Sequence, residues 1–266
     1  ALKLLLGLAH IGFMFMCLIT IIMLLLQIFL FMLNKLKKKK MSLINLSVDC
    51  VILGFDDDQK LKILLIKKSI GKSKEFQYAI PGDLLEENED LLCGAKRILK
   101  NLTSLSNLFL KQFRVFGDPL RTKDKKDQPW LKLYRKNPEE RVVTVGYLSL
   151  VKMEDYIPQA SSFAMDAEWV SLNKIPKNLA FDHNEIIKSG LLYLRTQLDH
   201  KIISNLLPSK FTLSQLQYIY EILLDEKLDK RNFRKNISKI NVIKKTKEKQ
   251  EGVAHKPAYL YTYDNL

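Results

Sequence analysis

Cysteine is scarce in this chain, whose 266 residues include only Cys17, Cys50 and Cys93. The three lie far apart in the sequence, so they do not have the paired spacing of cysteine metal ligands. Each lies in an apolar segment, and the pattern therefore predicts buried free thiols in a reducing compartment. This interpretation excludes a cysteine metal site and a fold that depends on disulfides.

Acidic residues are also in short supply, with 29 Asp and Glu against 43 Lys and Arg, and the net charge is +14. The sequence pI of about 9.5 is unusual for a metabolic enzyme and indicates an anionic partner. Six of the positive charges lie in the first forty residues, which leaves about +8 for the rest. The length has room for one mid-sized domain plus a small one, or for two domains.

Charged residues are absent from Leu4 to Leu33, and a basic run follows from Lys35 to Lys40. About thirty apolar residues, at about 1.5 Å of rise each, exceed the roughly 30 Å hydrocarbon core and are long enough to span a bilayer with tilt. The lysines would then place everything downstream in the cytoplasm. Alternatively, residues 1–40 are upstream sequence translated in frame, because the chain begins at Ala1 and Met41 resembles the start of a soluble domain. The membrane is a partner only in the first interpretation.

Residues 41–200 have the order of strands and helices that is typical of an α/β sandwich. Helical spacing predicts one helix through Leu92, Ala95, Leu99 and Leu102, and a second over 181–200. The polar stretch 117–140 is rich in turn residues and predicts a surface loop, and 56–59 is expected to be a turn. Strands are expected at 48–55, 62–68, 108–116, 141–151 and 167–172.

Residues 201–266 have a different pattern, that of two helices followed by a hairpin. Thr212, three residues before Gln215, predicts a capping box at the start of the first helix. Asp229 is the expected N-cap of a second helix over 230–240. Helix, short turn, basic helix and β-hairpin are the layout of a winged helix-turn-helix. The hairpin strands are expected at 241–245 and 258–263.

This C-terminal segment carries thirteen Lys and Arg against seven Asp and Glu, a net charge of +6, which predicts binding to double-stranded DNA. Arginine suits guanine and asparagine suits adenine. The residues predicted to reach base edges lie at the start of the second helix: Lys230, Arg231, Asn232 and Arg234. Those predicted to contact phosphate lie further along: Lys235, Lys239, Lys245, His255 and Lys256.

The stretch from Pro81 to Leu105 organises the first domain. A Pro-Gly turn, an acidic cluster and an amphipathic helix follow one another, and this frame resembles the signature box of the Nudix hydrolases. In that box, glutamates one helical turn apart hold the divalent cations that bridge a substrate's diphosphate. The chemistry of the box therefore depends on carboxylates at fixed positions.

Most of these carboxylates are missing here. Glu89 and Arg97 remain, but the three acidic positions that follow are Ile98, Asn101 and Leu102, which we expect to share one helix face. The box glycines are replaced as well, by Asp83 and Ser104. We therefore predict no catalytic residue, no metal site and no cofactor, with Glu89 and Arg97 as remnants of the box.

Residues 46–266 as a whole resemble the Nudix-related transcriptional regulators of bacteria. Segments that carry the resemblance are FGDPLR, LAFDHNEII, LLPSKFTLSQLQYIYE and LDKRNFRKNI, and the closing GVAHKPAYLYTYD resembles the wing of members from Bacteroidetes-like bacteria. The resemblance implies an α+β fold, a Nudix-type α/β/α sandwich followed by a small winged helix-turn-helix. Relatives repress genes of NAD or sugar metabolism, and their Nudix domain senses ADP-ribose or a sugar such as arabinose.

Two functions follow. In the first, residues 41–200 sense a sugar or nucleotide-sugar effector such as ADP-ribose and residues 201–266 bind an operator, as a homodimer that reads two half-sites. In the second, the chain is a Nudix hydrolase with a non-standard Mg²⁺ site. His183 is either a base or metal ligand, or a residue that orders its loop. We expect the effector pocket beside the box helix, lined by Phe116, Asp118, Arg121, Arg141, Asp182 and His183.

Overall fold

The computed structural model describes residues 16, 19–32, 44–55, 60–70, 76–197, 200–254 and 256–264. The chain divides into two units, Ala1–Leu43 and Ile44–Leu266. In the first unit, residues 19–32 are helical and their side chains are exposed. None of the described helices is both long enough and apolar enough to cross a membrane. Half of the apolar segment on which the anchor prediction depends, residues 4–15, 17, 18 and 33, lies outside the described residues, and Cys17 is among them.

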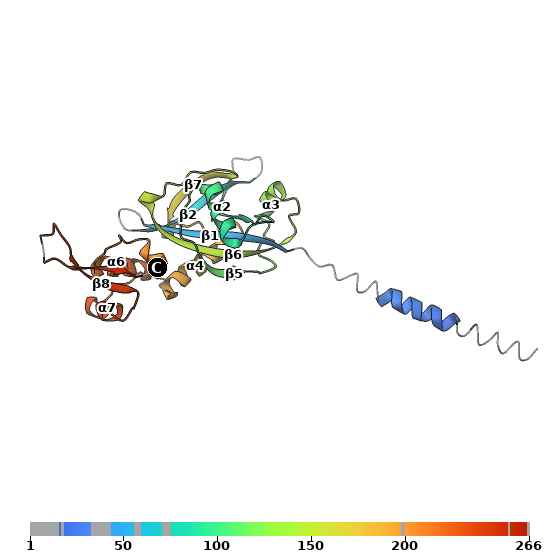
Figure 1. Ribbon diagram of the computed structural model, residues 1–266. Coiled ribbons are helices and arrows are strands. Elements are labelled where there is room, and N and C mark those ends of the chain that lie inside the picture. The colour runs from blue at the N-terminus through green and yellow to red at the C-terminus, as the bar shows by residue number, and fades with distance from the viewer. Residues whose placement is uncertain are drawn as a thin grey trace, which may run out of the picture. The chain divides into compact units, whose positions relative to one another are not determined.

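The second unit is built on a seven-stranded sheet (Figure 1). At its centre the long strand β1 (Ile44–Phe55) runs parallel to β6 (Arg141–Lys152). The strand order is β3-β2-β1-β6-β5, and β4 pairs with β1 while β7 pairs with β2. These other strands are antiparallel to their neighbours: β2 (Leu61–Ser69), β3 (Phe76–Ala79), β4 (Gly82–Leu84), β5 (Lys111–Phe116) and β7 (Ala164–Ser171).

Helices cover both faces of the sheet. Successive side chains of a strand point to opposite faces, so the continuous apolar run of β1 buries side chains on both. On β1, Ile52 packs into the core formed with α2 (Leu91–Thr103). Its neighbour Leu53 packs into the core formed with α4 (His183–Gln197). The predicted α/β/α sandwich is therefore confirmed.

The stretch 117–140 differs from the predicted surface loop. It contains the helix α3 (Gln128–Tyr134), in which Trp130 and Leu131 are buried. A helix of seven residues is too short to show a helical period in the sequence, so the polar residues around it dominated the pattern. The predicted turn at 56–59 lies outside the described residues.

The first turn of α2 also differs from the prediction. Cys50 is buried as expected, but Cys93 is exposed, so the prediction of buried thiols is wrong for Cys93. Leu92 is exposed as well, and the buried stripe of the helix begins with Gly94 and Ala95. Asp90 caps the helix by accepting a hydrogen bond from the Cys93 amide, and this cap fixes which side chains of the first turn face the sheet.

The remaining residues form the predicted winged domain. Thr212 Oγ1 accepts from the Gln215 amide and Gln215 Oε1 accepts from the Thr212 amide, so the capping box is confirmed. Asp229 accepts from the Asn232 amide at 2.8 Å, as the N-cap of the second helix. The elements are α5 (His200–Ser204), α6 (Leu213–Leu224), α7 (Lys230–Ile237), β8 (Ile243–Lys249) and β9 (Tyr259–Tyr263), and α7 ends before the predicted residue 240.

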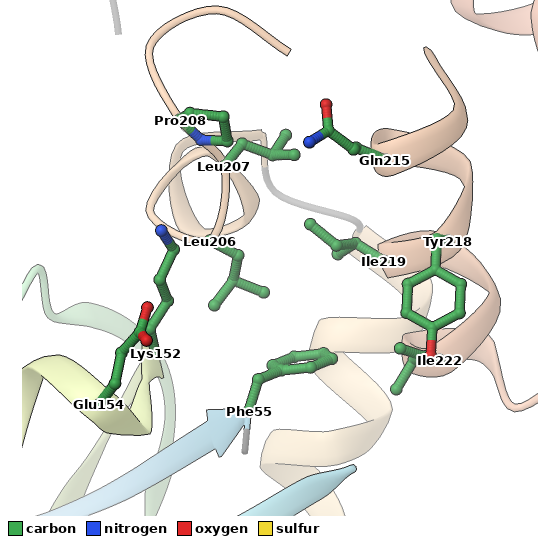
Figure 2. A pocket seen from close by; sticks show the side chains of 10 residues that line it. All are labelled: Phe55, Lys152, Glu154, Leu206, Leu207, Pro208, Gln215, Tyr218, Ile219 and Ile222. Carbon is green, nitrogen blue, oxygen red and sulfur yellow. The ribbon is translucent and has the colours of Figure 1, made fainter. Parts of the chain in front are cut away.

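The winged domain packs on the sandwich through α4 and α5. Leu194 of α4 and Leu216 of α6 belong to one continuous apolar core, and Arg195 Nε donates to the Leu223 carbonyl at 3.1 Å. The boundary also contains a pocket. Figure 2 shows Phe55, at the end of β1, facing Ile219 of α6 across a pocket of about 280 Å³.

Candidate functional site

The helix α7 presents a basic surface. Phe233 and Ile237, four residues apart, bury one face against the rest of the winged domain. The other faces are exposed and carry no acidic residue. Within the described residues, none of the basic side chains of α7 forms an ion pair, so all are available to an anion. All the residues of α7 that were predicted to contact DNA are exposed, namely Lys230, Arg231, Asn232, Arg234 and Lys235.

The other predicted phosphate contacts lie beyond α7. Lys239 is exposed in the turn after the helix, because the helix ends earlier than expected. Lys245 is exposed on β8, and Lys256 is exposed in the connection between β8 and β9. His255 lies outside the described residues. The structure thus places the eight described candidates on one small domain, on α7, the turn after it and the hairpin.

Glu89, the acidic residue that remains from the box, is hydrogen-bonded to an arginine. Arg97 donates to Glu89 Oε2 through Nε at 2.8 Å and to Oε1 through Nη2. These hydrogen bonds lower the pKa of Glu89 to about 2. Glu89 Oε1 also accepts from the Glu86 amide, so the carboxylate fixes the loop before α2. Its oxygens are already bonded within the protein.

The three positions at which the box has acidic residues do not share one helix face, so this prediction is wrong. Ile98 and Leu102 are each 1% exposed and lie in the core beneath α2, whereas Asn101 is exposed. Positions i and i+4 face the sheet here, and the side chain at i+3 lies at the edge of the buried stripe. Two of the three positions are thus part of the apolar core. Among the described residues, no three His, Cys, Asp or Glu side chains are grouped so that they could hold a metal ion.

A pocket of about 490 Å³ brings together four of the six predicted effector residues, namely Phe116, Asp118, Arg121 and Asp182. It lies where β5 and the loop after it meet the start of α4. No residue of α2 lines it, so the prediction of a pocket beside the box helix is wrong for this cavity. The remaining lining residues are Arg114, Val115, Gly117, Leu120, Asp124, Phe181 and Glu185.

Arg121 is the centre of the pocket's charge network. It donates to both oxygens of Asp182, through Nε at 3.0 Å and Nη2 at 2.7 Å, and its Nη2 also lies 3.2 Å from Asp49 Oδ2. Burial alone would raise the pKa of Asp49, but His183 and Arg121 outweigh it and hold the pKa well below its usual range. A side chain on Gly82, across from Asp49 on β4, would overlap this carboxylate.

His183 and Arg141 do not line this pocket. The Ile80 amide donates to His183 Nδ1 at 3.1 Å, so the ring proton is on Nε2, which lies 3.5 Å from Asp49 Oδ1. With 1% of its surface exposed, His183 orders the start of α4, which favours the second of its two predicted roles. Arg141 donates to the Gly117 carbonyl at 2.9 Å and shapes the loop that lines the pocket.

The pocket has the polar groups that a sugar requires. Its four carboxylates, on Asp118, Asp124, Asp182 and Glu185, can accept hydrogen bonds from hydroxyl groups, and Phe116 and Phe181 supply apolar surface. Arg114 donates to Ser189 at 3.0 Å and lies over the Phe116 ring. Sequence reasoning missed Arg114, Glu185 and Asp49; only Asp49 gave a signal, as a carboxylate inside an otherwise apolar strand.

Comparisons with known proteins agree with this architecture. The sequence model of the NUDIX domain matches residues 44–189, and that of the NrtR DNA-binding winged helix domain matches residues 203–263. A protein of Acinetobacter baylyi named ADPR responsive transcriptional repressor NtrR is 30% identical over 222 residues, which cover 82% of this chain and 81% of that protein.

Solved structures show the same likeness. The crystal structure of Shewanella oneidensis NrtR has a TM-score of 0.59 at 26% identity, over 82% of this chain and 94% of that one. The same protein complexed with a 27mer DNA has a TM-score of 0.59 at 25% identity, over 82% and 93% of the two chains. A MutT/nudix family protein from Enterococcus faecalis shares the fold, with a TM-score of 0.64 at 21% identity over 90% and 93%.

Proposed function

The chain belongs to the family of NrtR-type transcriptional repressors, in which a NUDIX domain is joined to a DNA-binding winged helix, and from this premise we propose that it is a DNA-binding repressor controlled by ADP-ribose. The observation that carries the proposal is the pairing of an exposed, basic α7 with a pocket in the sandwich that is lined by carboxylates and aromatic rings. The pocket lies at the start of α4, and α4 also contacts the winged domain.

DNA binding is supported by the chemistry of α7. Its first turn carries Arg231 and Asn232, whose side chains suit guanine and adenine edges in the major groove. Lys235 lies further along the helix and suits phosphate. The Shewanella protein that was crystallised with a 27mer DNA resembles 82% of this chain, and residues 203–263 match the model of the NrtR DNA-binding winged helix domain.

The effector assignment is supported by the Acinetobacter relative, which is named ADPR responsive, and by the carboxylates of the pocket. Ribose offers vicinal hydroxyls to Asp118 and Glu185, while Arg114 provides a cation at the same pocket. We further propose that the protein does not hydrolyse its effector and needs no metal, because Ile98 and Leu102 fill box positions in the core where carboxylates would be required.

The test uses the full chain and DNA duplexes selected from a random library by binding to it. Fluorescence anisotropy should show salt-dependent binding that ADP-ribose weakens, whereas ADP and free ribose have little effect. ADP-ribose incubated with the protein and Mg²⁺ should remain intact by chromatography. Release of AMP would favour the hydrolase instead, and DNA binding that ignores ADP-ribose would overturn the effector assignment.

Two variants of α7 test how the DNA is read. Arg231→Ala should weaken binding to the selected sequence and relax its specificity at one position by about 1–3 kcal/mol. Lys235→Ala should instead weaken binding to all sequences alike. It should also make the slope of log affinity against log salt shallower by about 1, the contribution of one phosphate contact. Equal affinity and selectivity of Arg231→Ala and the parent chain would show that α7 is not the recognition helix.

We also propose that the active species is a homodimer. A winged-helix repressor that reads two half-sites requires two copies of α7 related by a two-fold axis. Light scattering coupled to gel filtration should give twice the mass of the chain, about 62 kDa from 30.9 kDa per copy. A monomer that binds a single half-site would contradict this.

A further inference from the structure

Two lysines of the hairpin converge on one aromatic ring. Lys245 Nζ lies 3.5 Å from the centroid of the Tyr259 ring, and Lys249 Nζ lies 4.9 Å from the same centroid. Both distances fall within the range of cation–π attraction, about 6 Å. Neither lysine forms an ion pair within the described part of the chain.

The strand pairing places the three side chains together. Lys249 lies directly opposite Tyr259 across the hairpin, and the register of β8 and β9 shifts between Lys245 and Lys249. Lys245 lies opposite Tyr261, two residues from Tyr259 on the same strand, and the shift places Lys249 opposite Tyr259 where a regular ladder would place Lys247. The acidic neighbour Glu248 is engaged elsewhere, with Lys210 at 2.7 Å, so it does not neutralise the pair.

Tyr259 is not held there by the apolar core. Its side chain is 42% exposed, while Tyr261 and Tyr263 of the same strand pack against the core of the winged domain. A single exposed aromatic residue is common on protein surfaces, so exposure alone indicates no role. The observation that indicates one is the pair of ammonium groups over its ring.

We propose that Tyr259 is a positioning residue for DNA binding, which holds Lys245 and Lys249 as a phosphate clamp on the wing. The proposal rests on the proposed function and adds two residues, Tyr259 and Lys249, to the DNA-binding surface. The ring faces both cations and reduces the cost of keeping two like charges together before DNA arrives. The clamp binds the phosphate backbone, and phosphate contacts do not distinguish bases. It therefore increases the affinity for DNA of any sequence, while α7 determines the sequence specificity.

The experiment compares the full chain with Tyr259→Phe and Tyr259→Ile, using a random-sequence duplex and a series of salt concentrations. Phenylalanine keeps the π face and should bind as the parent does. Isoleucine keeps apolar bulk and suits a strand, but it lacks the ring, and it should bind about threefold to tenfold more weakly. Its dependence of log affinity on log salt should be shallower by about one to two phosphate contacts.

A merely structural role would not give that pattern. Thermal unfolding of both variants should resemble that of the parent. In a Lys245→Met, Lys249→Met background, Tyr259→Ile should cause no further loss of DNA affinity. If Tyr259→Ile matches the parent in affinity and salt slope, the clamp is overturned while the regulator assignment stands. If the parent itself does not bind DNA, the proposed function is overturned instead.

Discussion

Single residues keep traces of the box after its metal chemistry is gone. Ser104 replaces a box glycine and still adopts the left-handed conformation that favours glycine, with φ of 60°, as the C-cap of α2. Glu89 and Arg97 still face each other, but their hydrogen bonds now tie the loop before α2 to the helix. Both features give predictions at the scale of one residue.

Replacing Ser104 with glycine should stabilise the protein by about 0.5–1 kcal/mol, because glycine adopts a positive φ without the steric cost of a side chain. The exposed hydrogen bond from Ser104 Oγ to the Gln159 carbonyl, at 3.2 Å, is lost and offsets part of the gain. Urea unfolding measures the difference. Ser104→Ala, which loses that bond and keeps the strained backbone, is the matched control and should show no gain.

Replacing Glu89 with glutamine should destabilise the protein by about 1.5–3 kcal/mol at neutral pH, because a carboxylate bonded to Arg97 becomes a neutral amide. The pKa of Glu89 is about 2 in the folded state, below the unfolded value of about 4.3. Its stabilisation is therefore complete above the unfolded value and is lost as the pH falls towards 2. Urea unfolding over this pH range should show the two proteins converge, and a constant difference would contradict the prediction. The exposed neighbour Glu87→Gln should show little change at any pH.

At the scale of elements, the sequence predicted a helix or strand correctly where a side chain caps a helix or where a hydrophobic pattern extends over many residues. Thr212 and Asp229 located the two helices of the winged domain because each side chain bonds an amide three residues on. The short elements α3, β3 and β4 gave no such signal. The pocket could be predicted only in part, because Arg121 and Asp182 lie in separate loops that the fold brings together with Asp49 of β1.

The N-cap of α7 gives a prediction of its own. Asp229→Ala removes the bond to the Asn232 amide and should cost about 0.5–2 kcal/mol of stability, with faster amide exchange in the first turn of α7. Affinity for DNA should fall with it, since Arg231 and Asn232 lie in that turn. Asp229→Asn changes the charge equally but keeps a capping oxygen, so it should retain both the slow exchange and an affinity at least equal to that of the parent.

At the scale of the whole molecule, the helix α4 reaches from the proposed effector pocket to the winged domain. Asp182, just before α4, and Glu185, in its first turn, line the pocket, whereas Arg195 near the end of α4 donates a hydrogen bond to the Leu223 carbonyl of α6. That carbonyl is in the last turn of α6, where helix carbonyls lack partners within the helix. The boundary also contains the pocket between Phe55 and Ile219 (Figure 2), while Leu194 and Leu216 join the two domains in one apolar core.

Arg195→Ala should therefore weaken the coupling between ADP-ribose binding and DNA binding more than it weakens the binding of either ligand. Affinity for DNA alone and for ADP-ribose alone should stay within about twofold of the parent values, while the factor by which ADP-ribose weakens DNA binding falls towards one. Because coupling is reciprocal, DNA should weaken ADP-ribose binding by the same factor in each protein, and titration calorimetry with and without DNA measures it. Lys188→Ala, which removes an exposed cation from the same helix, is the control and should keep the parent's coupling. Full coupling in Arg195→Ala would mean that the signal passes through the apolar core between α4 and α6 without this hydrogen bond.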